Sequence, residues 1–395
     1  MSRGAASTPA ELFAGTDRRG RVRVRWATPA WLAVVGAMLL SAIGIASIAL
    51  TRPELAARQG AFLAIGIAAA SLTTFFSPRS LRISCWVVLA ISVALLVFVL
   101  LPFVPRSIVT PRNGARAWIN LGAADFQPSE LAKIAFILCT AQWVAMRGSP
   151  RTLLALAIPV GLCVALVGLI VLEPDLGSAL LFLPTLVAML VAAGTRKRYV
   201  LAALLAASIA APIAYFAVLK PYQRARIDAI VAQVRGDTRY ERDIGFQGWR
   251  AMRLAGAGGV FGNDADHARA LVRFNALPEE HNDMVFAVVA CRFGVVGGLL
   301  VLVASASIAV GALGTAWFAR DGFSKLVAVG VGALLFAQMT VNVGMTIGLL
   351  PITGVTLPFV SYGGSSLVAC WTLVGLLVGI GIRPPTGADK CSFDG

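Results

Sequence analysis

Long runs of apolar residues, separated by short polar segments, dominate the hydrophobic pattern of this chain. Each run extends over about 15 to 25 residues, without the alternation of apolar and polar positions that marks the strands of a transmembrane barrel. The pattern therefore predicts a bundle of membrane-spanning helices. Ten spans are expected, at roughly 30–50, 61–76, 82–104, 129–146, 152–172, 177–193, 199–219, 284–314, 325–350 and 357–382.

The composition agrees with this interpretation. Of the 395 residues, 58% are hydrophobic and 13% are charged, and the mean hydropathy is +0.81. An ordinary soluble domain has about 25% charged residues, so a soluble enzyme, a disordered chain and a fibrous repeat are excluded. We expect an all-α polytopic membrane protein of ten transmembrane helices, with one long extracytoplasmic loop between spans seven and eight.

The distribution of Lys and Arg orients the expected spans. Ten spans place both chain ends on one side of the membrane, where the segments hold 17 Lys and Arg residues against 5 in the short loops opposite. Because cytoplasmic segments carry the excess of basic residues, both termini are expected in the cytoplasm. The net charge of +15 follows from this topology and predicts no nucleic-acid partner. The expected domains are a basic tail (1–29), the membrane domain (30–382, with external loop 220–283) and a second tail (383–395).

The first segment with candidate chemistry precedes and opens the fourth span. Arg116 and Trp118 lie before it, and Trp118 is either a residue of the interfacial aromatic belt or a surface for a ligand. Lys133 lies one helical turn inside the apolar run, three residues after Glu130. An ionisable group at that depth is expected to be functional. The alternative is a purely structural ion pair with Glu130.

Acidic residues mark two further boundaries on the same predicted outer face. Asp175 follows Glu173 between spans five and six, and either caps the next helix or contacts a substrate. Asp283 ends the long loop at the edge of an apolar run. Desolvation there raises the pKa of a carboxylate towards the range of a general base. A plain helix cap is the alternative for Asp283. A metal ion held by His281 and Asp283 is a third possibility.

The long loop contains a candidate surface helix. Apolar residues recur at helical spacing over 245–260, and this segment is expected to form an amphipathic helix on the membrane surface. The glycines that follow do not match a dinucleotide or P-loop pattern.

Five segments in this order resemble the SEDS family of bacterial membrane glycosyltransferases, typified by RodA and FtsW. They are Arg-Ala-Trp-Ile with Gln-Pro-Ser-Glu-x-x-Lys (116–133), Glu-Pro-Asp-Leu-Gly (173–177), Tyr-Gln-Arg-x-Arg-Ile (222–227), Leu-Pro-Glu-x-His-x-Asp (277–283) and Pro-Phe-Val-Ser-Tyr-Gly-Gly-Ser-Ser (358–366). The resemblance covers roughly 30–382 and implies a ten-span fold. The segment Asn-Val-Gly-Met-Thr-Ile-Gly (342–348) is most similar to the RodA-like branch.

The resemblance implies polymerisation of lipid II, a polyprenyl-diphosphate-linked disaccharide, into glycan strands at the outer face of the bacterial cytoplasmic membrane. The implied partner is a class B penicillin-binding protein, a transpeptidase. Asp283 is the expected general base, while Arg116, Lys133 and a divalent cation such as Mg²⁺ are candidates to balance the departing diphosphate. Trp118 offers an aromatic face to a sugar or to the lipid. The remaining residues expected to bind substrate are Gln127, Glu130, Asp175, Glu279, His281, Ser361 and Ser365.

Two alternatives from other functional classes remain open. A lipid flippase or transporter is expected to show internal repeats and ionisable residues near the midplane of several spans. No clear repeat is evident, and the intramembrane ionisable residues are few: Glu130, Lys133 and Arg292. An inactive scaffold of the elongation or division machinery is suggested by departures from the family pattern. Asn282 and Met284 stand where the family usually has Thr and Phe. Cys291 and Arg292 replace two acidic residues, and 263–264 replaces Lys-Gly.

Overall fold

The structure is a computed structural model. It describes residues 26–105, 107–111, 115–122, 124–148, 150, 152–218, 221, 224–225, 227–228, 232, 245–319 and 321–383. The two expected tails (all but 26–29 and 383) and most of the segment 219–244, including Tyr222, Gln223 and Arg226, lie outside the described residues.

Helices occupy the positions of all ten expected spans in the described part of the chain. Eight of them are long and apolar enough to cross a membrane. Two further positions hold a shorter apolar pair of helices and a helix of 17 residues with a π-helical extension. The all-α polytopic class is therefore confirmed, while the number of spans stays a prediction. The elements are α2 (Ala30–Thr51), α3 (Pro53–Phe75), α4 (Pro78–Leu100), α5 (Pro128–Arg147), α6 (Leu153–Leu172), α7 (Leu176–Leu180), α8 (Phe182–Ala192), α9 (Lys197–Ile213), η1 (Ala214–Val218), α13 (Val285–Phe318), α14 (Gly322–Thr346) and α15 (Gly364–Gly381).

Proline and glycine explain where the helices differ from the hydrophobic pattern. Helix α3 begins at Pro53, earlier than its apolar run, because Pro is favoured at the first helical position. The sixth span is split into α7 and α8 around Leu181, since Pro184 lacks an N–H and its ring clashes with the carbonyl of Leu180. The expected tenth span starts as a non-helical loop, and α15 begins only at Gly364.

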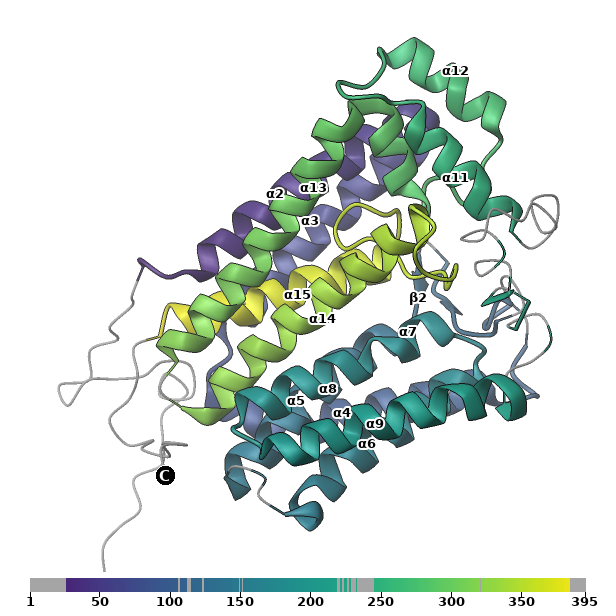
Figure 1. Ribbon diagram of the computed structural model, residues 1–395. Helices are drawn as coiled ribbons and strands as arrows, with labels where there is room; N and C mark the ends of the chain where they lie inside the picture. Colours follow the sequence, from purple (N-terminus) through teal and green to yellow (C-terminus); the bar gives the residue numbers. More distant parts are fainter. Residues whose placement is uncertain are drawn as a thin grey trace, which may run out of the picture.

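The helices form two groups that α14 connects (Figure 1). In one group α13 packs along α2 and α15 packs along α3; in the other, α5 packs against α4 and α6. Helix α14 contacts α13 in the first group and α5 and α8 in the second. The start of α2 and the end of α15 lie at the same end of the bundle in Figure 1. This placement agrees with an even number of membrane crossings.

The opposite end of the bundle, which we call the loop end, carries the elements that are not spans (Figure 1). They are α11 (Phe246–Gly256), α12 (Ala265–Asn275) and a small antiparallel hairpin of β1 (Ile119–Asn120) and β2 (Asp125–Phe126). The expected helix within 245–260 is thus confirmed. Its buried residues Ala251 and Leu254 pack in one cluster with α12, the start of α13 and Leu50. Its apolar face therefore covers protein.

A break in α13 accounts for the glycines after α11. At Gly294 the backbone adopts φ +67°, ψ −163°, which interrupts the helix. The freed N–H groups of Val295 and Val296 donate hydrogen bonds of 3.0 and 3.2 Å to the carbonyls of Gly259 and Val260. A β-carbon at Gly294 would lie 2.3 Å from the Val260 carbonyl oxygen, so only glycine permits this contact. The kink thus fixes the turn after α11 to the membrane domain.

Candidate active site at the loop end

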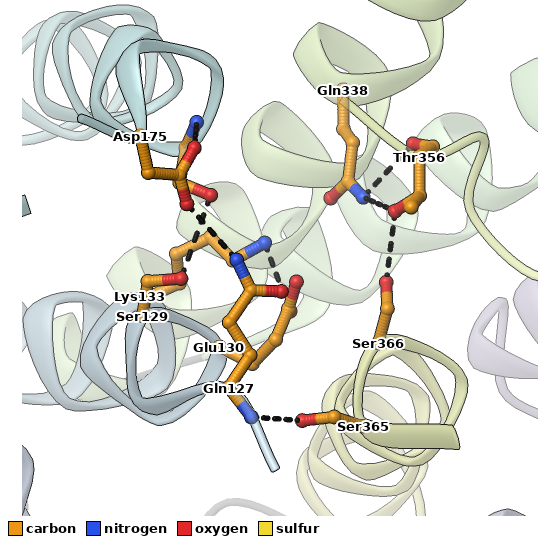
Figure 2. Close-up of polar contacts among 10 residues, drawn as sticks. Gln127, Ser129, Glu130, Lys133, Asp175, Gln338, Thr356, Ser365 and Ser366 are labelled. Atoms are coloured by element: carbon orange, nitrogen blue, oxygen red, sulfur yellow. Dashed lines mark hydrogen bonds and ion pairs between the residues drawn. The ribbon is translucent and has the colours of Figure 1, made fainter. Parts of the chain in front are cut away.

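Polar side chains from α5, α7, α14, α15 and the loop before α15 meet between the two helix groups (Figure 2). We call this set the polar cluster. It brings together four of the expected substrate-binding positions besides Lys133, and it adds residues that the motifs did not single out. The polar cluster comprises Gln127, Ser129, Glu130, Lys133, Asp175, Ser178, Gln338, Thr356, Ser365 and Ser366.

The predicted ion pair within α5 is confirmed. Lys133 Nζ lies 2.9 Å from Glu130 Oε2, and the two side chains are 3% and 7% exposed. Two charges this deeply buried are costly unless they compensate each other. Each side chain therefore needs the opposite charge of the other, or a further charge brought by a ligand, to stay ionised in this buried position.

Asp175 caps α7, as one alternative expected, and it also contacts Gln127, while a substrate contact stays a prediction. Its Oδ1 accepts a hydrogen bond of 3.0 Å from the N–H of Ser178, which caps α7. Its Oδ2 accepts one of 2.9 Å from Gln127 Nε2. The backbone N–H of Gln127 in turn donates to Ser365 Oγ at 3.1 Å. Gln127 thus connects the starts of α5, α7 and α15 (Figure 2).

Asp283 lies in the turn before α13, where its carboxylate faces the loop that precedes α15. The N-cap residue of α13 is Met284, so Asp283 is not the cap that one alternative expected. A β-carbon at Gly354 would lie 3.8 Å from Asp283 Oδ2. The preceding residue of this loop approaches α7, because a β-carbon at Gly177 would lie 2.5 Å from the carbonyl oxygen of Thr353. Residues 353–354 therefore approach both the start of α7, which Asp175 caps, and Asp283.

The same loop also joins the polar cluster to Asp283 along the chain. Thr356 Oγ1 is 3.0 Å from Ser366 Oγ and accepts a hydrogen bond of 3.2 Å from Gln338 Nε2. The Ser361 hydroxyl donates to the carbonyl of Asn282 at 2.6 Å and accepts from the N–H of Leu357 at 2.7 Å. Ser361, expected to bind substrate, is thus engaged within the protein.

The titratable side chains next to Asp283 are half-buried, and burial shifts the pKa values of two of them. Burial raises the pKa of the Glu280 carboxyl, and the charge of Arg52, 3.6 Å away, opposes this shift. Burial lowers the pKa of the His281 imidazole, which favours the neutral ring. The His281 ring stands edge-on to Tyr362, with centroids 5.9 Å apart. Glu279 accepts a hydrogen bond from the side chain of Asn282.

Arg116 and Trp118 lie in the segment just before the hairpin and outside the polar cluster. Arg116 Nη2 donates a hydrogen bond of 3.1 Å to the carbonyl of Val104, and the Trp118 carbonyl accepts one of 3.3 Å from Thr110. Strand β2 of this hairpin packs against α15. The expectation that Arg116 and Lys133 bind one diphosphate stays a prediction.

Three of the departures from the family pattern, Asn263, Cys291 and Arg292, contact one another. Arg292 Nη1 donates a hydrogen bond of 2.6 Å to the Asn263 carbonyl, and Asn263 Nδ2 donates one of 2.9 Å to the Cys291 carbonyl. Asn263 also bonds the carbonyl of Ala257 at 3.0 Å. These three changed positions thus form one unit that holds the turn after α11 against the α13 kink. Their contacts are structural and do not include the Asp283 side chain.

Two buried amides at the loop end were not assigned a role from the sequence. Asn342, on α14, is fully buried and donates to the carbonyls of Asp283 and Val355 at 2.8 and 2.7 Å. Gln59, on α3, donates to the carbonyl of Ser361 at 2.9 Å. The available signal was an amide within a helix that is largely apolar, because a polar group buried there requires a partner.

The model of the FtsW/RodA/SpoVE family, described as cell cycle proteins, matches residues 23–383. The chain belongs to this family. It is similar to the probable peptidoglycan glycosyltransferase FtsW of Geobacter metallireducens (32% identity over 331 residues, 82% of this chain and 84% of the relative). It is similarly close to stage V sporulation protein E of Bacillus subtilis (32% identity over 330 residues, 82% and 86%).

Two solved structures share the fold of this FtsW/RodA/SpoVE family member. One comes from a study of polymerisation and crosslinking by a peptidoglycan synthase complex (TM-score 0.75, 31% identity, 88% of this chain and 96% of that chain). The other is the crystal structure of the rod shape determining protein RodA of Thermus thermophilus (TM-score 0.65, 28% identity, 89% and 95%). As a member of this family, the protein is a membrane glycosyltransferase of cell wall synthesis. The lean towards the RodA branch stays a prediction.

Proposed function

We propose that the protein polymerises lipid II into glycan strands at the outer face of the bacterial cytoplasmic membrane, with Asp283 as the general base. The observation that carries this proposal is the loop 351–363. Its Gly354 faces the Asp283 carboxylate, and its Thr356 bonds Ser366 of the polar cluster that holds Lys133. One short loop thereby contacts both the proposed base and the cluster that holds the buried cation, and a transfer between two sugars with a diphosphate leaving group uses a base and a cation.

The chemistry assigns one task to each group. The Asp283 carboxylate takes the proton of the acceptor sugar hydroxyl, whose oxygen forms a bond to the anomeric carbon of the donor. The bond between that carbon and the phosphate oxygen breaks, and the polyprenyl diphosphate departs with its electron pair. Lys133 is the candidate cation for the negative charge that develops there. No nucleotide is needed, because the donor brings its own leaving group.

The test is polymerisation by the purified protein, with and without a class B penicillin-binding protein as its proposed transpeptidase partner. Wild-type protein incubated with lipid II is expected to yield glycan polymer on a gel. Asp283→Asn, which is nearly isosteric, is expected to lower the rate by about 10²- to 10⁴-fold, the usual contribution of a general base. Asp264→Asn, at the N-cap of α12, makes the same exchange elsewhere in the loop and is expected to retain activity.

A near wild-type rate for Asp283→Asn would remove Asp283 from this role and make Glu279 or Glu280 the next candidate. Absence of polymer from the wild type, under conditions where an FtsW relative is active, would favour the scaffold alternative. Movement of labelled lipid II across proteoliposome membranes without polymer would favour a flippase.

A divalent cation such as Mg²⁺ is the other group proposed to balance the diphosphate. Among the described residues, no group of three or more His, Cys, Asp and Glu side chains is placed to hold a metal ion. We therefore assign no ligand set and no step to it. Polymerisation measured in EDTA, and again after Mg²⁺ is restored, tests the requirement.

The proposed orientation places the loop end outside the cell and both termini inside. It is supported by the excess of Lys and Arg in the segments on the termini's side. Cysteine at the exposed Ala270 of α12 is expected to react with an impermeant maleimide in intact spheroplasts, and Cys391 of the tail only after lysis. The reverse pattern would place the site in the cytoplasm.

A further inference from the structure

Three consecutive backbone carbonyls lead up to and include Asp283, and each accepts a hydrogen bond from a different donor. In the order of residues 281–283, the donors are the N–H of Tyr362 at 2.8 Å, the hydroxyl of Ser361 at 2.6 Å and the Nδ2 of Asn342 at 2.8 Å. Two of these donors come from the loop before α15, and the third comes from α14. The peptide groups of this segment are thus fixed by distant parts of the chain.

Asn342 differs from the other two donors because its amide reaches two segments at once. The same Nδ2 donates to the carbonyl of Val355 at 2.7 Å, next to Gly354, which faces the Asp283 carboxylate. Asn342 is fully buried. One side chain therefore fixes the distance between the backbone of Asp283 and the loop opposite its carboxylate.

The backbone of residues 281–283 needs hydrogen-bond partners from elsewhere, because it lies before α13 and the helix does not hold its orientation. Residues 279–284 form a turn in which Glu279 has φ +54°, and the N–H groups of Asn282 and Met284 both donate to the Glu279 carbonyl. Helical geometry begins only at Val285. The direction of a side chain follows from the orientation of its own backbone, so the Asp283 peptide plane determines where the carboxylate points.

We propose that Asn342 is a positioning residue for the reaction: it acts through Asp283 by orienting the backbone that carries the proposed base. This inference rests on the proposed function of Asp283. It predicts an effect on the rate of the chemical step and not on the affinity for lipid II. A misplacement of about 1 Å in a reacting group costs about 10²-fold in rate.

The experiment compares Asn342→Ala with Thr346→Val in the full-length protein. Thr346 is a matched control, because it is also fully buried, lies one turn further along α14 and donates only to the carbonyl of Asn342 in its own helix. Asn342→Ala is expected to lower kcat for polymerisation by about 10- to 100-fold, with KM for lipid II changed less than about threefold. Thr346→Val is expected to keep kcat within about threefold of wild type.

A double-variant comparison separates positioning from a general loss of structure. If Asn342 acts through Asp283, Asn342→Ala lowers the residual rate of Asp283→Asn no further, since the base is already absent. An equal fractional loss in both backgrounds would overturn the inference. A near wild-type kcat for Asn342→Ala, with Asp283→Asn inactive, would overturn it and leave the proposed base in place. Full activity of Asp283→Asn would overturn both.

A second variant covers the case in which Asn342→Ala does not yield folded protein. Ser361→Ala removes the hydroxyl that bonds the neighbouring Asn282 carbonyl and leaves α14 unchanged. The same selective loss of kcat, again absent in the Asp283→Asn background, is expected from it. A rise in KM with kcat unchanged would instead assign Ser361 to substrate binding and overturn the shared positioning role.

Discussion

Gln127 at the start of α5 donates a hydrogen bond of 2.9 Å to Oδ2 of Asp175 at the start of α7. The two residues are 48 positions apart and belong to two separate sequence motifs. The contact makes the two motifs parts of one site, and it gives the Asp175 carboxylate two donors, because the N–H of Ser178 already donates to Oδ1.

Asp175→Asn is expected to destabilise the protein by about 1–2 kcal/mol, because an amide has one acceptor oxygen for these two donors. Thermal unfolding in detergent measures the effect. Asp264→Asn, which makes the same exchange at the N-cap of α12, is the control and is expected to cost less. If the two variants unfold alike, the Gln127 contact adds nothing to the cap.

Variants of the buried pair Lys133 and Glu130 distinguish a structural from a catalytic role of Lys133. Lys133→Met alone leaves Glu130 uncompensated and is expected to cost about 3–5 kcal/mol of stability. Lys133→Met combined with Glu130→Gln removes both charges and is expected to recover most of that stability. If Lys133 also binds the diphosphate, the double variant stays at least about 10-fold slower in polymerisation. Full recovery of activity per folded molecule would make the pair purely structural.

Glu173 is expected to make stability depend on pH in the direction opposite to a carboxylate whose pKa is lowered by folding. Burial, with the charge of Asp175 adding to it, raises the pKa of the Glu173 carboxyl from 4.5 to about 9. Between these values the folded protein holds a proton that the unfolded chain has released, so this contribution is present at low pH and is lost as pH rises.

Glu173→Gln imitates the protonated acid at every pH. The melting temperature of this variant minus that of the wild type is therefore expected to increase from about pH 5 to about pH 8. A difference that stays constant over this range would show that Glu173 is ionised in the folded state.

Arg292→Ala is expected to loosen the turn after α11 without stopping the reaction. Its hydrogen bond to the Asn263 carbonyl holds this turn to the kink of α13, away from the Asp283 side chain. The hydrogen-exchange rate of the backbone amides of residues 257–263 is expected to rise by about 10-fold. This change corresponds to about 1.4 kcal/mol, the size of a charged hydrogen bond. Arg273→Ala, at an exposed position of α12, is the control. A polymerisation rate reduced as far as by Asp283→Asn would place Arg292 in the catalytic machinery.

The spans and the local pairs were predictable because they depend on neighbours along the chain. Apolar runs located every long helix, since a helix in lipid satisfies its own backbone groups whatever surrounds it. The spacing of Glu130 and Lys133 likewise places them on one helical face. The start of α15 was not predictable from hydropathy, because residues 357–363 are apolar enough for a helix but are held as a loop by contacts to Gln59 and to residues 281–282.

The sequence by itself determined the class of protein, the positions of its helices and the motifs at their ends, because these follow from hydrophobicity and local geometry. The tertiary structure alone decided which motifs share a site. It placed residues 353–354 against both Gly177 and Asp283, and it bonded Arg116 to the carbonyl of Val104. It also gave Asn342 its two carbonyl partners. Such contacts join residues far apart in the chain, and the packing of the helices fixes them, which no local pattern encodes.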